Sequence, residues 1–285
     1  MYIRDPDVKV IMVKETPKWT IKEFNMRDVM DDSICVFIGK RRSGKSVLVT
    51  ELMYYKRHFK KGVVMCGSIS NVQHYSRFIP GIFVYNKFDI FKLKNIVEKH
   101  KKRRMKFPNE KMFILLDDCA YDSKALNSLI IKELFFNGRH HGILLIITMQ
   151  YCLNLKPELR NNIDFTFLCH EKNPKTKEKL FDNFNPVFDK LADFNRVFAS
   201  CTQNYECMVI DNAVQSSAIS DNVFWYKATL NRNFLVGKKG RWWLYHKHNF
   251  KKDASVIANE TEDVVKTKIM KVKRKRRKNK RRTKS

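Results

Sequence analysis

Residues 39–46 read G-K-R-R-S-G-K-S, which matches the pattern G-x-x-x-x-G-K-[ST] of a phosphate-binding loop. An apolar, strand-like run precedes it at residues 34–38, and residues 47–53 continue with helix-like spacing. Glycines let backbone N–H groups approach phosphate oxygens where a Cβ would collide, and the following helix points its positive end at the same anion. A Gly/Ser turn with solvated bases is the alternative, but the strand–loop–helix order favours a nucleotide site. Its expected phosphate contacts are Gly39, Lys40, Arg41, Arg42, Ser43, Gly44, Lys45, Ser46 and Val47.

The second half of such a site is an acidic residue at the end of another buried strand. Residues 111–118 read K-M-F-I-L-L-D-D, a continuous apolar run of the kind found in a parallel strand that is covered on both faces. We expect Ser46 and Asp117 to hold Mg²⁺, Lys45 to reach the β- and γ-phosphates, and Asp118 to polarise the attacking water. Aspartates that only form a turn at the strand end are the alternative.

Three further polar residues are candidates for the chemistry. Gln150 ends the apolar run at residues 143–149 and is placed to sense the γ-phosphate or to position the water; a strand-capping amide is the alternative. Arg160 stands shortly before a further apolar run at residues 165–168, where an arginine can reach a neighbouring subunit's γ-phosphate. Arg139 is the competing candidate for that role. For either arginine, an ordinary surface position is the alternative.

Three segments together carry a family resemblance: the loop at residues 39–46, the L-L-D-D-C ending at residues 115–119, and G-R-H-H-G-I at residues 138–143 leading to T-M-Q at residues 148–150. In this order and spacing, they resemble the DNA-packaging ATPases of large DNA viruses. That family includes the poxvirus packaging ATPase and its giant-virus relatives within the FtsK/HerA superfamily of P-loop NTPases. The resemblance covers approximately residues 34–168, and cellular FtsK-like pumps usually have Glu at the position of Asp118.

The resemblance implies more than the residues alone. It implies a RecA-like core, ATP and Mg²⁺ as cofactors, a homo-oligomeric ring, and translocation of double-stranded DNA into a capsid. Capsid or virion membrane proteins are then the expected partners. The expected location is the host cytoplasm, in a viral factory, or the virion, with the nucleus as a further option.

Charge independently points to a polyanionic partner. The 285 residues include 57 Lys and Arg against 29 Asp and Glu, which gives a formal net charge of +28 and a pI near 9.9. Nucleic acid is favoured over an anionic membrane, because no basic amphipathic helix with an apolar face is evident. The apolar runs are strand-length and residues 1–7 lack the apolar region of a signal peptide, so we expect neither a transmembrane helix nor secretion. The seven cysteines show no zinc spacing and are expected to be reduced.

Alternating strand and helix patterns predict an α/β fold with a mainly parallel sheet flanked by helices. Residues 1–32 are expected to form an N-terminal extension, in which residues 19–24 can pack over the edge of the core, and residues 33–222 the P-loop core. The segment N-K-F-D at residues 86–89 matches a guanine-recognition pattern, but it precedes Asp117, whereas in GTPases it follows the metal-binding strand. We therefore interpret it as a turn and helix cap, and adenine remains the default base.

The chain changes character after the core. Residues 223–253 interleave aromatic and basic residues and are interpreted as a terminal β-hairpin that packs Trp242 and Trp243 on the core, with nucleotide contacts as the alternative. Residues 254–285 form a basic tail with eleven Lys and Arg and no acid between Lys271 and Ser285; we expect it to be disordered and to bind DNA or act as a nuclear signal. Two other functions stay open for the chain: a P-loop nucleotide or nucleoside kinase, and a non-motor nucleic-acid-binding NTPase.

Overall fold

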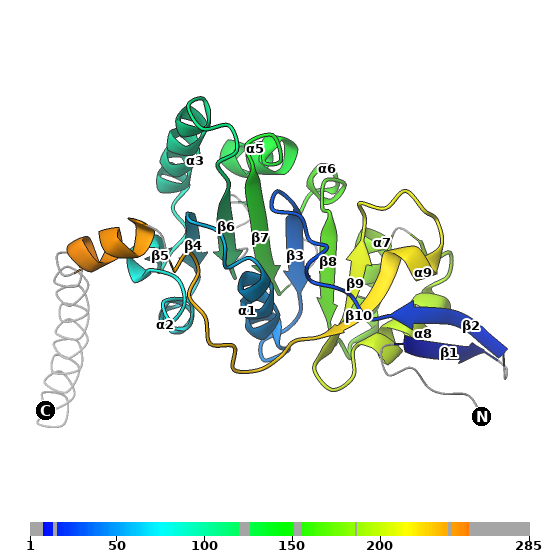
Figure 1. Cartoon of the computed structure of the whole chain (residues 1–285). Helices are drawn as coiled ribbons and strands as arrows, with labels where there is room; N and C mark the ends of the chain where they lie inside the picture. Colours follow the sequence, from blue (N-terminus) through cyan, green and yellow to red (C-terminus); the bar gives the residue numbers. More distant parts are fainter. Residues whose placement is uncertain are drawn as a thin grey trace, which may run out of the picture.

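A computed structural model describes residues 8–13, 16–119, 126–150, 155–185, 187–238 and 241–250 (Figure 1). Its centre is an eight-stranded sheet in the order β10-β9-β8-β3-β7-β6-β4-β5. The strands of this sheet are β3 (Ile34–Ile38), β4 (Gly62–Cys66), β5 (Val84–Tyr85), β6 (Met112–Asp117), β7 (Ile143–Met149), β8 (Phe165–Cys169), β9 (Glu206–Asp211) and β10 (Val223–Lys227).

The sheet is mainly parallel, as the sequence predicts. The six strands from β8 to β5 pair in parallel, while β9 and β10 are added at one edge in antiparallel pairs. The carboxyl ends of the parallel strands therefore meet at one edge of the sheet. Ligands of parallel α/β sheets bind at that edge, and both the phosphate loop after β3 and the aspartates that end β6 lie there.

Helices cover both faces of the sheet, which explains why the parallel strands are apolar throughout. In β3, Val36 packs into one buried cluster and Phe37 into the cluster on the opposite face. On one face lie α1 (Lys45–Tyr55) and α2 (Ile69–Tyr75), and on the other α3 (Ile90–Arg104), α5 (Leu129–Asn137), α6 (Pro157–Arg160), α7 (Pro174–Phe184) and α8 (Leu191–Cys201). The α/β P-loop fold expected from the sequence is confirmed.

The N-terminal segment is a hairpin of β1 (Val8–Val13) and β2 (Thr16–Lys22), which lies beside β10 and α8 (Figure 1). After it, the backbone N–H of Phe24 donates to the carbonyl of Trp225 at 2.8 Å, and the Phe24 ring is buried among aromatic rings of the sheet. Phe24 thus joins the N-terminal hairpin to the sheet beside β10.

Past residue 222 the structure differs from the expected hairpin. β10 follows the short helix α9 (Ile219–Asn222) and pairs with β9, so the sheet continues beyond the boundary expected at residue 222. The chain then passes the lower end of α1 toward β4 and β5 (Figure 1), and residues 241–250 are helical. Only the packing of the aromatic residues is as expected: Trp242 is buried against Phe83 and Phe113.

The start of α3 agrees with the sequence. Asp89 caps α3, accepting a hydrogen bond from the Lys92 backbone N–H at 2.9 Å, so the N-K-F-D segment ends in a helix cap as interpreted. The polar, phenylalanine-rich stretch at residues 173–195 contributes to two helices, α7 and α8. Among the described residues, no helix has both the length and the apolar character needed to cross a bilayer. The basic tail at residues 254–285 lies outside the described residues.

Candidate nucleotide-binding site

The loop after β3 has the geometry of a phosphate cradle. A Cβ on Gly39 would come within 2.6 Å of both Cys169 Cβ and Ser43 Oγ, so only glycine fits there. Gly44 has a φ of 96°, which is left-handed and favours glycine, and α1 begins at the next residue. The ammonium group of Lys45 donates to the carbonyl oxygens of Gly39 and, at 3.0 Å, Lys40, which holds it over the loop. Burial lowers the pKa of Lys45.

On the side of β8, the loop is fixed by an ion pair. Lys40 Nζ lies 2.7 Å from Glu171 Oε1, and the Glu171 carboxylate also accepts the Asn173 backbone N–H at 2.7 Å. Burial by itself would raise the pKa of Glu171, but these contacts outweigh it and hold the pKa below its usual value. Lys40 is thus tied to the end of β8 by this ion pair.

Asp117 ends β6 as a buried carboxylate, 2 % exposed. Its Oδ1 accepts the Thr148 hydroxyl at 2.6 Å and its Oδ2 accepts the Asn71 side-chain amide at 2.6 Å. Burial raises the pKa of Asp117, because both hydrogen-bond donors are neutral and offset only part of the cost of desolvating the charge. A divalent cation beside this carboxylate would supply the missing positive charge.

Asp118 and Gln150 lie together at the same edge. The Gln150 side-chain amide donates to Asp118 Oδ2 at 2.6 Å. Asp118 has a φ of 53°, a left-handed conformation that Asp tolerates better than most residues, and its backbone N–H donates to Thr148 Oγ1 at 2.9 Å. One hydroxyl, that of Thr148, therefore links both aspartates. The structure brings together the acidic pair and the glutamine that the sequence singled out from separate strands.

The two arginine candidates lie at the amino ends of the strands, opposite the edge that carries the phosphate loop. Arg139, which precedes β7, forms an ion pair with Asp164, and Asp164 also accepts the backbone N–H of Ile34 at 2.8 Å, where β3 begins. Arg160 ends α6, donates to the Leu155 carbonyl at 3.1 Å and lies 6.0 Å from the centre of the Phe184 ring. The full length of β3 separates these amino ends from the chain's own phosphate loop, so neither arginine is placed to act on its own subunit's nucleotide.

Two residues that position Asp117 carried no clear signal in the sequence. Thr148 is opposite Asp117 in the β6–β7 register, which a correct strand alignment would have revealed. Asn71 comes from α2, and only its place in a polar run after β4 pointed to this edge. Among the described residues, no group of three or more His, Cys, Asp and Glu is arranged to hold a metal. Mg²⁺ at phosphate sites is held by one or two carboxylates together with phosphate oxygens, so Asp117 and Ser46 fit it.

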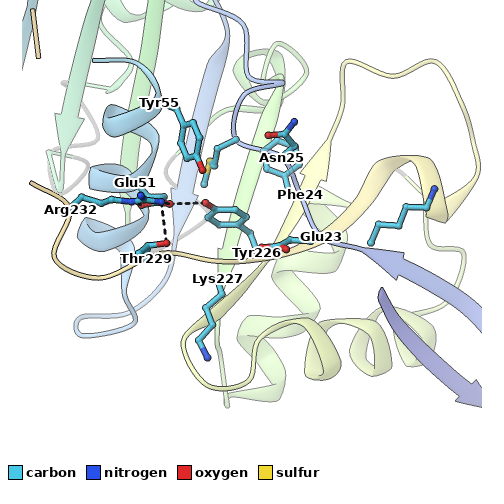
Figure 2. Close-up of a pocket in the computed structure, with 11 residues that line it drawn as sticks. Glu23, Phe24, Asn25, Glu51, Tyr55, Tyr226, Lys227, Thr229 and Arg232 are labelled. Atoms are coloured by element: carbon cyan, nitrogen blue, oxygen red, sulfur yellow. Dashed lines mark hydrogen bonds and ion pairs between the residues drawn. The ribbon is translucent and has the colours of Figure 1, made fainter. Parts of the chain in front are cut away.

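A separate cavity of about 580 Å³ lies beside α1 (Figure 2). Figure 2 shows Glu51 of α1, Tyr226 of β10 and Arg232 converging at one side of it. Arg232 donates to both carboxylate oxygens of Glu51, at 2.7 and 2.8 Å, and the Tyr226 hydroxyl donates at 3.0 Å. No residue of the phosphate loop lines this cavity. The cluster connects α1, whose first turn is part of the nucleotide site, to the segment after β10.

Comparison with known proteins places the chain among viral proteins. No profile of a known protein family matches the sequence. It is 34 % identical over 232 residues to the uncharacterised protein L437 of Acanthamoeba polyphaga mimivirus, covering 78 % of this chain and 81 % of L437. The chain belongs to a family of proteins of large DNA viruses. This family includes L437.

Solved structures share its fold. The genome packaging NTPase B204 of Sulfolobus turreted icosahedral virus 2, in complex with ATPγS, aligns with a TM-score of 0.55 at 17 % identity, over 71 % of this chain and 100 % of B204. The pCW3 conjugation coupling protein TcpA, with ATPγS, aligns with a TM-score of 0.51 at 14 % identity, over 83 % of this chain and 70 % of TcpA. These proteins share the α/β P-loop fold of this chain, which agrees with the fold that the resemblance in the sequence implies.

Proposed function

We propose that this protein is an ATP-hydrolysing DNA translocase that packages viral double-stranded DNA into the capsid. The observation that carries the proposal is the arrangement of Asp117, Asp118 and Gln150 at the sheet edge that holds the phosphate loop. Membership in a family of large-DNA-virus proteins and the fold shared with B204 support the packaging role. The net charge of +28 supports a nucleic-acid partner.

In this mechanism, each residue has a separate task. Backbone N–H groups of the loop and Lys45 would bind the phosphates, and Ser46 and Asp117 would hold Mg²⁺, which when bound would neutralise charge that develops on the phosphates. Asp118 accepts a hydrogen bond from the attacking water, and Gln150 orients the Asp118 carboxylate through their 2.6 Å contact. Arg160 acts in trans, at the γ-phosphate held by the neighbouring subunit of a homo-oligomeric ring, with Arg139 as the competing candidate.

The proposal extends to the setting of the reaction. The partners are double-stranded DNA and capsid or virion membrane proteins, and the location is the viral factory in the host cytoplasm, or the virion, with the nucleus as an option through the basic tail. A P-loop nucleotide kinase and a non-motor NTPase are the competing functions. The Asp118–Gln150 pair argues against a switch that only binds nucleotide, because it provides a group that can activate water.

A hydrolysis assay separates the proposed translocase from the kinase. Purified full-length protein is assayed for phosphate release from ATP with Mg²⁺, alone, with long duplex DNA, and with a mixture of nucleosides and nucleoside monophosphates as acceptors. A translocase should respond to duplex DNA by faster turnover, and its mass in solution with ATPγS should be that of a ring. Turnover that rises only with a small acceptor, with transfer of the phosphate to it, would contradict the proposal and identify a kinase.

A further inference from the structure

The position of the catalytic groups fixes the direction in which a bound nucleotide extends. Asp118 follows β6 and Gln150 follows β7, and both strands lie on the same side of β3 in the sheet order. In a nucleotide held by the loop after β3, the terminal phosphate points toward Asp118. The nucleoside must then extend to the opposite side of β3, over β8 and β9. The base should therefore be met by a residue at the carboxyl edge of those strands.

An exposed tyrosine lies at that place. Tyr205 belongs to the turn between α8 and β9, and because β9 is antiparallel to β8, this turn lies at the edge that carries the phosphate loop. The Cδ1 atom of Tyr205 is 3.9 Å from the position that a Cβ on Gly44 would occupy, so its ring lies beside the loop at Gly44. Its side chain is otherwise open to solvent, with the residue 76 % exposed.

The backbone of this turn is strained in a way that presents the ring. Asn204 and Tyr205 have φ values of 49° and 64°, and the Glu206 backbone N–H closes the turn on the Gln203 carbonyl at 2.8 Å. Asn tolerates the left-handed conformation, but a bulky aromatic residue is strained there. Such outliers concentrate at ligand sites. A tyrosine kept in this strained conformation therefore indicates a role for its ring.

We propose that Tyr205 is the base-stacking residue of the nucleotide site, with its ring against the face of the purine. The inference rests on the proposed nucleotide site and names the part of it that the phosphate-loop motif leaves open. An aromatic ring offers a flat apolar face to any base, so stacking contributes affinity for the nucleoside half of the ligand and none for the triphosphate.

The test compares two ligands that differ only in the nucleoside. Affinities of Mg²⁺–ATP and Mg²⁺–tripolyphosphate are measured by calorimetry for full-length wild type, Tyr205→Asn and Tyr205→Phe. Asn suits the left-handed backbone, so the turn is expected to persist. Tyr205→Asn should weaken ATP binding about tenfold, in line with the loss of one stacked base, and leave tripolyphosphate binding unchanged. Tyr205→Phe keeps the ring and should retain the affinity for ATP.

The matched control is Phe91→Ala, which removes another exposed aromatic ring, 81 % exposed on α3, outside the site. It should change neither affinity. Equal weakening of ATP and tripolyphosphate by Tyr205→Asn, or no weakening of either, would overturn the stacking role while the phosphate site remains. Wild-type protein that binds neither ligand would instead refute the nucleotide site and the proposed function with it.

Discussion

At the scale of single residues, the site divides binding from chemistry. Lys45 lies over the phosphate loop, whereas Asp118 is hydrogen-bonded to Gln150 at the end of the neighbouring strands. A group that binds phosphate stabilises both the ground state and the transition state, while a group that acts on the water contributes mainly to the transition state. Substitutions at these two positions should therefore separate ATP affinity from turnover.

We expect Lys45→Ala to abolish ATP hydrolysis and to weaken ATP binding strongly. Asp118→Asn should reduce turnover by about 100-fold or more and leave ATP affinity largely intact, because the amide cannot accept the proton of the water. Asn also tolerates the φ of 53° found at Asp118, so the strand end should keep its shape. Steady-state hydrolysis and equilibrium binding of ATPγS measure the two effects. Loss of all ATP affinity in a folded Asp118→Asn protein would show that its role is misassigned.

A buried histidine outside the site is expected to make the stability of the fold depend on pH. His100 on α3 is buried and its Nε2 lies 2.9 Å from the carbonyl oxygen of His141, to which it donates. Burial lowers the pKa of His100, an effect that exceeds the opposing hydrogen bond. The folded state then binds a proton less tightly than the unfolded chain does. Stability from this group is complete above the unfolded pKa of about 6.5 and is lost as the pH falls below it.

We expect His100→Gln to flatten the dependence of the melting temperature on pH between pH 7 and pH 5. Gln can still donate to the His141 carbonyl but does not titrate, so the variant should lose less stability than wild type on acidification. Part of the slope should remain, since burial also lowers the pKa values of His74, His141 and His246. Parallel curves for the two proteins would contradict the assignment of the slope to His100.

At the scale of elements, an ion pair with one buried carboxylate joins α1, the helix after the phosphate loop, to the segment after β10. Glu51 of α1 is completely buried and accepts two hydrogen bonds from Arg232 and one from Tyr226. Removing one member of a buried pair leaves the other charge without a partner, which costs more than the pair itself contributes. The segment after β10 is therefore coupled to the helix that begins at the nucleotide site.

Arg232→Ala should lower the free energy of unfolding by about 3 kcal/mol, because the Glu51 carboxylate would remain buried with only Tyr226 as a donor. The double variant Glu51→Leu/Arg232→Leu removes both charges and should recover most of that loss. Urea unfolding of the two variants and wild type measures the difference. A double variant less stable than Arg232→Ala would contradict the view that the unpaired carboxylate is responsible.

Local patterns predicted the elements around the phosphate site, and long-range pairing decided the rest. The loop at residues 39–46 and the apolar runs of β3, β6 and β7 were readable because each motif is contiguous. The partner of β10 could not be predicted. Residues 223–227 could pair with β9 or with a following strand, and only tertiary packing selects β9. Trp242 was predicted to pack on the core, but the helix at residues 241–250 that carries it was not. Asn71 reaches Asp117 from 46 residues away, a contact without a local pattern.

At the scale of the whole molecule, Arg160 lies at the amino ends of the strands, away from its own phosphate loop, which fits the role in trans that we propose for a ring of subunits. If Arg160 completes a neighbour's site, a subunit with Arg160→Ala still holds an intact phosphate loop, and a subunit with Lys45→Ala still offers an intact arginine. Alone, Lys45→Ala should not hydrolyse ATP, and Arg160→Ala should turn over about a thousandfold or more slowly than wild type. Mixed rings should recover part of the turnover, because some interfaces then join an intact loop to an intact arginine.

ATP hydrolysis by mixtures at varied ratios, with ring assembly checked by solution mass, measures this complementation. The corresponding mixture of Arg139→Ala and Lys45→Ala is the matched comparison. Arg139 is paired with Asp164, so we expect the Arg139→Ala subunit to be active alone and to gain nothing specific from mixing. No recovery with Arg160→Ala, although both variants assemble, would move the role in trans to Arg139.

The basic tail gives the last prediction, which depends on the whole chain. Eleven Lys and Arg with no acid occupy residues 271–285, which lie outside the described residues. Each phosphate that they neutralise releases condensed counterion, so the logarithm of the affinity for duplex DNA falls with log salt by about 0.9 per contact. Truncation after Met270 should weaken DNA binding at low salt and flatten this slope.

ATP hydrolysis without DNA should stay nearly unchanged, because the nucleotide site is formed by residues far upstream. Neither form should show sequence preference, since phosphate contacts carry none. DNA affinity titrated between 50 and 200 mM salt for both forms measures the slope. An unchanged slope would assign the tail to nuclear targeting or to another acidic partner.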